Sequence, residues 1–105
     1  DTAPFVMALA HASGREPVVL GKPAPAFFNA ALARLGVDAS EACMVGDDIR
    51  TDVGAAQDVG IRGILVRTGK FRPDDLGSGI EPAAVLSGIG DLPASLRAGH
   101  ITQFR

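Results

Sequence analysis

Three short apolar runs, separated by helical patterns, constrain the fold of this chain more than any other feature of its sequence. The runs lie at residues 18–20, 42–45 and 64–66, and each is apolar along its whole length. Such runs are typical of strands that are buried on both faces of a sheet. Between them, residues 25–35 and 49–59 carry apolar side chains at helical spacing. Strands that alternate with helices in this way predict an α/β fold in which helices cover a parallel sheet.

Further elements are expected on either side of this pattern. A helix is predicted over residues 4–12, because their apolar side chains fall on one stripe and Gly14 follows. Residues 72–75 are predicted to form a loop with one helical turn. A short fourth strand is predicted at residues 83–86, and a last helix is expected to begin with Asp91 as its N-cap.

Three glycines are expected to shape these elements. Gly36 is placed to end the helix over residues 25–35. Gly46, after the second predicted strand, would allow a tight turn there. Gly54 costs about 1 kcal/mol relative to alanine inside a helix, and close approach of the helix backbone to the sheet would explain its presence.

Composition limits the classes of protein to which the chain can belong. At 105 residues it is one domain or part of one. Its net charge of −2 and 5% aromatic content give no footprint for nucleic acid or an anionic membrane as a partner. The sequence has no signal peptide and no apolar stretch long enough to span a bilayer, so a cytoplasmic location is expected.

Cys43 is the single cysteine, and its apolar neighbours predict a buried, inert thiol. Because the chain begins at Asp1 and enters a helical pattern almost at once, we expect it to be a piece of a longer polypeptide.

Polar side chains directly follow the three predicted strands. Lys22 follows the first, Asp47 and Asp48 follow the second, and Thr68 and Lys70 follow the third. Right-handed crossovers place the carboxyl ends of parallel strands at the same edge of a sheet. Ligands bind in the crevice beyond those ends. The sequence therefore predicts a site at this edge.

The residue types at this edge suit a divalent metal and a phosphoryl group. Asp47, Asp48 and Asp52 can offer oxygen ligands to a hard cation such as Mg²⁺, and the last two share a helix face. The same aspartates could instead cap a helix N-terminus, and Lys22 could be a solvated loop residue. A lysine after one strand and an acidic cluster after the next are nevertheless what Mg²⁺-dependent phosphoryl transfer requires.

Other phosphate-handling patterns fit the sequence less well. Gly63 and Gly69-Lys70 do not make a Walker A loop, because five residues separate the glycines and Phe71 follows the lysine. In a phospho-acceptor receiver-like domain the acidic pair precedes the lysine, whereas Lys22 comes first here. The Walker A motif is therefore absent, and the receiver-like domain ranks below Mg²⁺-dependent phosphoryl transfer.

Three segments stand in a characteristic order, namely Gly21-Lys22-Pro23-x-Pro25-x-Phe27-Phe28, Met44 to Gln57, and Leu65 to Pro73. Together they resemble the haloacid dehalogenase (HAD) superfamily, and most closely its branch with a large C2-type cap, subfamily IIA. The resemblance covers residues 4–73. It implies a three-layer α/β/α Rossmann-like core with a parallel sheet, of which residues 1–105 are the C-terminal portion.

The resemblance also implies a role for each site residue. Lys22 looks like the lysine that binds and stabilises the phosphate, and Asp47 looks like a Mg²⁺ ligand. Asp48 and Asp52 look like the supporting acids, which contact the metal's waters or orient Lys22. In this family an early Asp-x-Asp motif supplies a nucleophile, which forms an aspartyl-phosphate, and an acid–base aspartate. This sequence contains neither that motif nor a cap segment.

We therefore predict that the parent protein is a Mg²⁺-dependent phosphohydrolase of a small phosphorylated molecule, and that this chain alone is inactive. Phosphomonoesters, pyrophosphate and phosphoamides are all allowed substrates. The alternative is a non-catalytic half-Rossmann interaction or regulatory module, against which the intact set of Lys22, Asp47 and Asp52 counts. An exposed sheet edge also makes a homodimer or other self-association expected.

Overall fold

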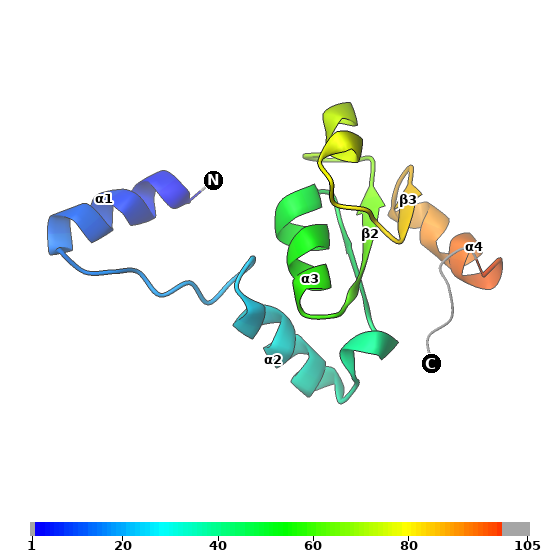
Figure 1. The fold of residues 1–105 in the computed structure, drawn as a ribbon, viewed down its shortest axis with the longest axis horizontal. Coiled ribbons are helices and arrows are strands. Elements are labelled where there is room, and N and C mark those ends of the chain that lie inside the picture. Colours follow the sequence, from blue (N-terminus) through cyan, green and yellow to red (C-terminus); the bar gives the residue numbers. More distant parts are fainter. Residues whose placement is uncertain (1, 100–105) are drawn as a thin grey trace.

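The computed structural model describes residues 2–99 as an elongated molecule with principal extents of 52 × 34 × 23 Å (Figure 1). In chain order its elements are α1 (Ala3–Ser13), α2 (Pro25–Leu35), η1 (Ala39–Glu41), β1 (Cys43–Gly46), η2 (Ile49–Gly54), α3 (Ala55–Asp58), β2 (Arg62–Val66), η3 (Pro73–Gly77), β3 (Ala84–Leu86), η4 (Ile89–Asp91) and α4 (Leu92–Arg97). No helix in this part of the chain has the length and apolar character needed to cross a membrane.

The three strands form one parallel sheet in the order β1-β2-β3. Val45 pairs with Ile64, and Ile64 pairs in turn with Ala84, so β2 lies in the middle. Four of its five residues, those after Arg62, are buried. The runs at 42–45, 64–66 and 83–86 were each predicted as strands, and those three predictions are confirmed. The fold class, an α/β fold with a parallel sheet, is confirmed with them.

The strand predicted at residues 18–20 is wrong. Val18, Val19 and Leu20 lie in the extended connection between α1 and α2 and are 82%, 56% and 75% exposed (Figure 1). A strand exists only where a neighbour pairs with its N–H and C=O groups, and no strand of the described chain lies beside this run. The apolar run correctly indicated an extended backbone, but it could not indicate a partner.

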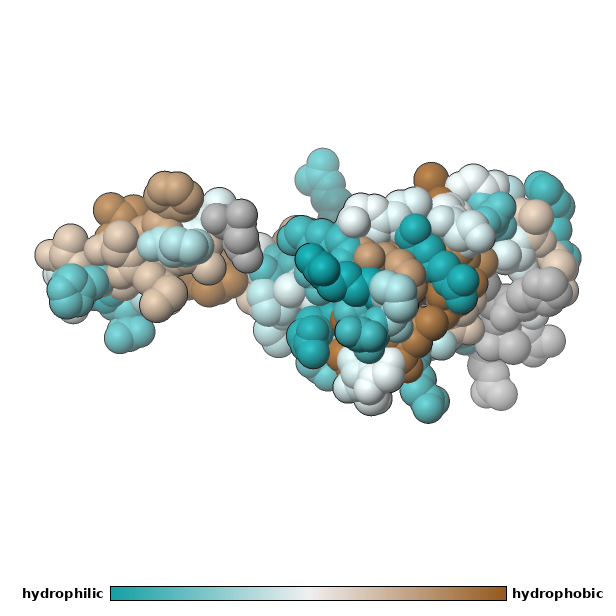
Figure 2. Space-filling model, turned by 90° about the horizontal axis from the view of Figure 1, so that it is seen from above, coloured by the Kyte–Doolittle hydropathy of each residue, from teal (hydrophilic) through white to brown (hydrophobic). Residues whose placement is uncertain are grey.

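Most of the core lies between the sheet and the helices that precede and follow β1. One cluster joins α2 to α3 through Phe28, Ala55, Ala56 and Ile61. A second consists of Ile49, Val53 and Leu65, against which Phe71, Ile80 and Val85 pack. By contrast, α1 has no buried residue and stands apart from the rest of the molecule (Figure 2). We call residues 2–24 the N-terminal arm and residues 25–99 the sheet body.

The helix predicted over residues 49–59 is present, but its first part, η2, is π-helical, and only Ala55–Asp58 is α-helical. Gly54 lies where the two parts join. A Cβ there would come within 2.9 Å of Cδ1 of Ile80. Gly54 therefore makes room for a loop side chain. The close approach to the sheet that was expected to explain this glycine is not what its missing Cβ allows. Gly36 ends α2 in the left-handed conformation, as predicted.

Two smaller predictions have mixed outcomes. Asp91 precedes the last helix, as expected, but its side chain makes no capping hydrogen bond. Cys43 is only half-buried in β1. Burial raises the pKa of its thiol, which is consistent with the inert thiol that was expected.

Candidate functional site

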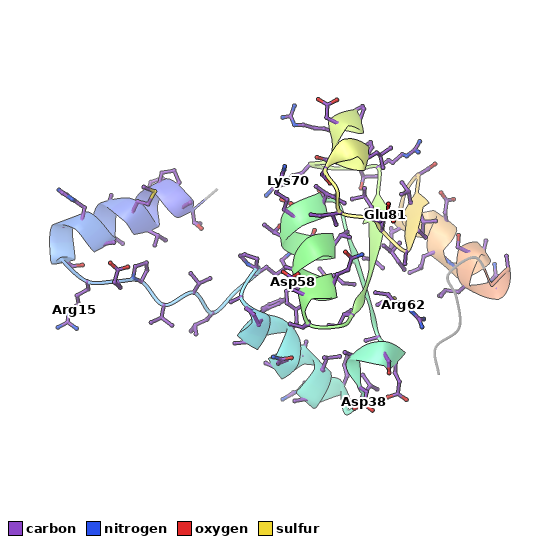
Figure 3. All side chains as sticks on the ribbon, in the orientation of Figure 1. Arg15, Asp38, Asp58, Arg62, Lys70 and Glu81 are labelled. Carbon is purple, nitrogen blue, oxygen red and sulfur yellow. The ribbon has the colours of Figure 1, made fainter. Side chains whose placement is uncertain are left out.

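The structure brings Lys22, Asp47, Asp48, Asp52 and Lys70 together at the carboxyl ends of β1 and β2. Lys22 comes from the arm, the three aspartates follow β1, and Lys70 follows β2. Figure 3 labels Lys70 beside the start of the helix after β1, whereas Asp58 is labelled nearer its far end. The edge of the sheet that was predicted to carry the site does carry these residues.

Asp52 is the buried centre of the group. Its Oδ1 accepts from Nζ of Lys22 at 2.5 Å, and its Oδ2 accepts from the backbone N–H of Asp48 at 3.2 Å. Its side chain is 5% exposed and that of Lys22 is 38% exposed. A buried carboxylate is stable only when it is paired and hydrogen-bonded, and both oxygens of Asp52 are engaged here.

Gly46 is the residue that lets Asp52 approach the end of β1. A Cβ at Gly46 would collide with the Asp52 carboxylate. Gly46 is not among the glycines with a positive φ, so a left-handed backbone does not explain why a glycine stands there. Its role is the close approach of a carboxylate to the backbone.

Asp48 caps the helix that follows β1. Its Oδ1 accepts from the backbone N–H groups of Arg50 and Thr51, each at 3.0 Å. The bond from Thr51, then the bond from Arg50 and the charge of Lys70, hold the pKa of the Asp48 carboxyl below its ordinary value, although partial burial opposes them. The capping role that the sequence left open is present, and the metal-binding role of Asp48 stays a prediction.

Asp47 is held by the loop that follows β2. Its Oδ2 accepts from the backbone N–H of Lys70 at 2.6 Å, while Nζ of Lys70 lies 4.0 Å from Oδ2 of Asp48. Oδ1 of Asp47 accepts no hydrogen bond within the described chain. Asp47 is half-buried, and one of its two carboxylate oxygens is fixed by a hydrogen bond.

The carboxylates fit Mg²⁺ better than a metal that needs a full protein cage. Within residues 2–99, no group of three or more His, Cys, Asp or Glu side chains is arranged to hold a metal ion. Zinc sites require three or four such ligands. Mg²⁺ keeps several waters and is commonly bound by one or two carboxylates together with substrate phosphates. Asp47, with Asp48 beside it, meets that smaller requirement.

A groove of about 570 Å³ opens between the site and the arm. Lys22, Asp48, Thr51 and Lys70 line it on the side of the site. The facing wall consists of apolar and small residues of α1 and of the connection after it, which are Thr2, Ala3, Val6, Met7, Pro17, Val18 and Val19. Asp47 and Asp52 do not line it. The groove is therefore lined by the charged side chains of Lys22, Lys70 and Asp48 on one side and by mainly apolar residues of the arm on the other.

Sequence reasoning missed the contribution of the Lys70 backbone. The sequence indicated Lys70 only as a polar residue after a strand. In the structure its backbone N–H donates the hydrogen bond that holds Oδ2 of Asp47. A backbone donor leaves no residue-type signal, and Gly69 beside it was the only mark in the sequence.

Comparison with known proteins identifies the family of the chain. A HAD-hydrolase-like family model matches residues 19–92. The phospholysine phosphohistidine inorganic pyrophosphate phosphatase of Bos taurus is 56% identical over 75 residues, which are 71% of this chain and 28% of that protein. The human haloacid dehalogenase-like hydrolase domain-containing protein 2 is 54% identical over 72 residues, 69% of this chain and 28% of that protein. The chain thus spans 28% of the length of each of these relatives.

Two solved structures share the fold. The p-nitrophenyl phosphatase from Archaeoglobus fulgidus superposes with a TM-score of 0.76 and 35% identity, covering 90% of this chain and 38% of that one. NagD from E. coli K-12 superposes with a TM-score of 0.77 and 31% identity, covering 84% and 36%. The resemblance inferred from the motifs is confirmed, and the chain belongs to the HAD-hydrolase-like family.

Proposed function

We propose that the whole protein is a Mg²⁺-dependent phosphatase that works through an aspartyl-phosphate, and that this chain carries its metal-binding and phosphate-binding side. The observation that carries the proposal is the ion pair between Lys22 and buried Asp52, next to Asp47, at the carboxyl edge of a parallel sheet. The printed names of several relatives and structural neighbours, which are phosphatases, support the reaction class.

Each residue of the group has a chemical task in this proposal. An ammonium group has three N–H donors. Lys22 uses one on Asp52, so two remain for phosphoryl oxygens. Asp52 positions Lys22, and Asp47, supported by Asp48, holds the metal. Mg²⁺, when bound, supplies positive charge that stabilises the phosphoryl group as charge develops on it.

The substrate in this proposal is a small phosphorylated molecule, either a phosphomonoester, a pyrophosphate or a phosphoamide. The name of the Bos taurus relative includes the last two classes. The sequence of this chain contains no Asp-x-Asp motif to supply a nucleophile. We therefore expect the 105-residue chain to bind Mg²⁺ without hydrolysing phosphate esters.

A Mg²⁺ titration of the chain, followed by NMR, tests the metal site. We expect the amide signals of Asp47 and its neighbours to shift, and Asp47→Asn to abolish the response. Asp58→Asn, at an exposed aspartate of α3, is the control and should leave the response intact. No shift near Asp47 would favour the non-catalytic module. Mg²⁺-dependent turnover of an aryl phosphate by the chain alone would contradict the expected inactivity.

A further inference from the structure

Gly69 adopts a backbone conformation that brings the chain unusually close to Asp47. It lies in the loop after β2 with φ of +53°, in the left-handed region that favours glycine. A Cβ built on Gly69 would collide with the Asp47 carboxylate. Gly69 therefore satisfies two constraints, one from its own backbone and one from the side chain that lies against it.

The second constraint is not a general property of left-handed glycines in this protein. Gly36 and Gly79 also have positive φ, at +68° and +87°, and a Cβ at either would meet nothing within 4 Å. At Gly60 the nearest atom would be an alanine methyl at 3.5 Å. Within the described chain, Gly69 is the left-handed glycine whose missing Cβ makes room for a carboxylate.

The next residue uses this approach to bind the same carboxylate. The backbone N–H of Lys70 donates to Oδ2 of Asp47 at 2.6 Å. Hydrogen bonds to carboxylates are shorter and stronger than bonds between neutral groups. The sheet sets the distance, because Gly46 at the end of β1 pairs with Leu65 of β2, so the loops after the two strands lie side by side.

We propose that the Gly69–Lys70 turn is a positioning element for Asp47: it fixes Oδ2 by a backbone hydrogen bond and leaves Oδ1 for Mg²⁺. The proposal rests on the proposed function for the identity of the ligand, but the fixing of Asp47 does not depend on it. Partners that orient a metal ligand typically change metal affinity about 10- to 100-fold when they are lost.

The test is Gly69→Ala in the 105-residue chain, with Gly36→Ala as the matched control. Both substitutions place a Cβ on a left-handed residue, so both carry the same kind of backbone strain, but only the first displaces a carboxylate. We expect Gly69→Ala to weaken Mg²⁺ binding by about 10- to 100-fold and to remove the hydrogen-exchange protection and downfield shift of the Lys70 amide. Gly36→Ala should change neither. Equal effects of the two variants would overturn the proposal.

A second background separates positioning from simple destabilisation. In an Asp47→Ala chain the carboxylate is absent, so adding Gly69→Ala should cause no further loss of hydrogen-exchange protection at the Lys70 amide. A further loss of protection there would overturn the proposal. If Gly69→Ala does not fold, Asp47→Ala alone decides, because the Lys70 amide must then lose its downfield shift and its protection. If the wild-type chain binds no Mg²⁺ while the Lys70 amide responds as expected, the proposed function fails and the positioning role stands.

Discussion

The N-terminal arm and the sheet body contain apolar side chains of the same kinds, yet fully buried ones occur only in the body. Leu9 in α1 is 70% exposed and Leu65 in β2 is fully buried. Val18 in the arm and Val53 in the body differ in the same way. The apolar residues of the body have a complementary surface to pack against, whereas those of the arm do not. Burial requires such a neighbour and not merely an apolar residue.

The site is where the two regions meet. Lys22 near the end of the arm forms its ion pair with Asp52 of the body, and the groove lies between them. Elsewhere the arm runs away from the sheet (Figure 1). The ion pair of Lys22 with Asp52 therefore connects the arm, whose apolar side chains are exposed, to the body, which contains the buried core.

The largest effect is expected from removing a packed side chain of the body. Leu65→Ala should lower the free energy of unfolding by about 2–5 kcal/mol, because it leaves a cavity in the core. Leu9→Ala in the arm is the matched control and should change it by no more than about 0.5 kcal/mol. Urea unfolding followed by circular dichroism measures both. A similar loss in the two variants would show that α1 is packed in solution.

The next effect concerns the contact between the two regions. Lys22→Met leaves Asp52 as a buried carboxylate without its cation, and should lower the free energy of unfolding by about 1–3 kcal/mol. Arg15→Met, at an exposed position of the arm, should lower it by less than about 0.5 kcal/mol. If Lys22→Met costs no more than Arg15→Met in urea unfolding, the ion pair does not hold the arm to the body.

A smaller effect, with a pH dependence, is expected at the helix cap of the body. Asp48→Ala removes the acceptor for two N–H groups and should cost about 1 kcal/mol at neutral pH. The pKa of Asp48 lies below its ordinary value of 3.8 in the folded chain, so its charge stabilises the fold above that pH. This contribution is lost as the pH falls through the lowered pKa.

Asp48→Asn separates the charge from the cap, because its amide oxygen still accepts a hydrogen bond. The stability difference between wild type and Asp48→Asn should therefore shrink as the pH is lowered from neutrality through the acid range. Asp74→Asn, at an exposed aspartate in η3, serves as the control. A difference that stays constant with pH would show that the charge of Asp48 contributes nothing to folding.

Most of the sheet body could be predicted from the sequence, because its signals are local. Helix α2 has apolar residues at helical spacing with a glycine after it, as α1 of the arm does, and β1 and β2 are short apolar runs. The run at 18–20 carries the same local signal and forms no strand. Pairing depends on a neighbour that is distant in sequence, and a local pattern contains no information about that neighbour.

The candidate site could be predicted in its residues but not in its contacts. Lys22 and the three aspartates were identified from their places after predicted strands and from the family resemblance, although the strand predicted before Lys22 does not form. The sequence did not reveal that Gly46 packs closely against Asp52, or that Gly69 packs closely against Asp47. In both cases a glycine without a side chain allows the contact, so only the three-dimensional structure reveals what lies against it.

The smallest effect on stability is expected in the arm itself, at the run that was predicted as a strand. Val18→Ser with Leu20→Ser should change the free energy of unfolding by less than about 0.5 kcal/mol, because both side chains are exposed. The same change should lower self-association, since an exposed apolar, β-branched run and an open sheet edge are surfaces on which copies of a chain can pair. Sedimentation velocity over a range of concentrations measures this, with Ala3→Ser and Ala12→Ser in α1 as the control pair. A wild-type chain that stays monomeric would rule out self-association. A clear loss of stability in the double variant would instead show that residues 18–20 pack within the monomer. The unpacked part of the arm would then end before residue 18.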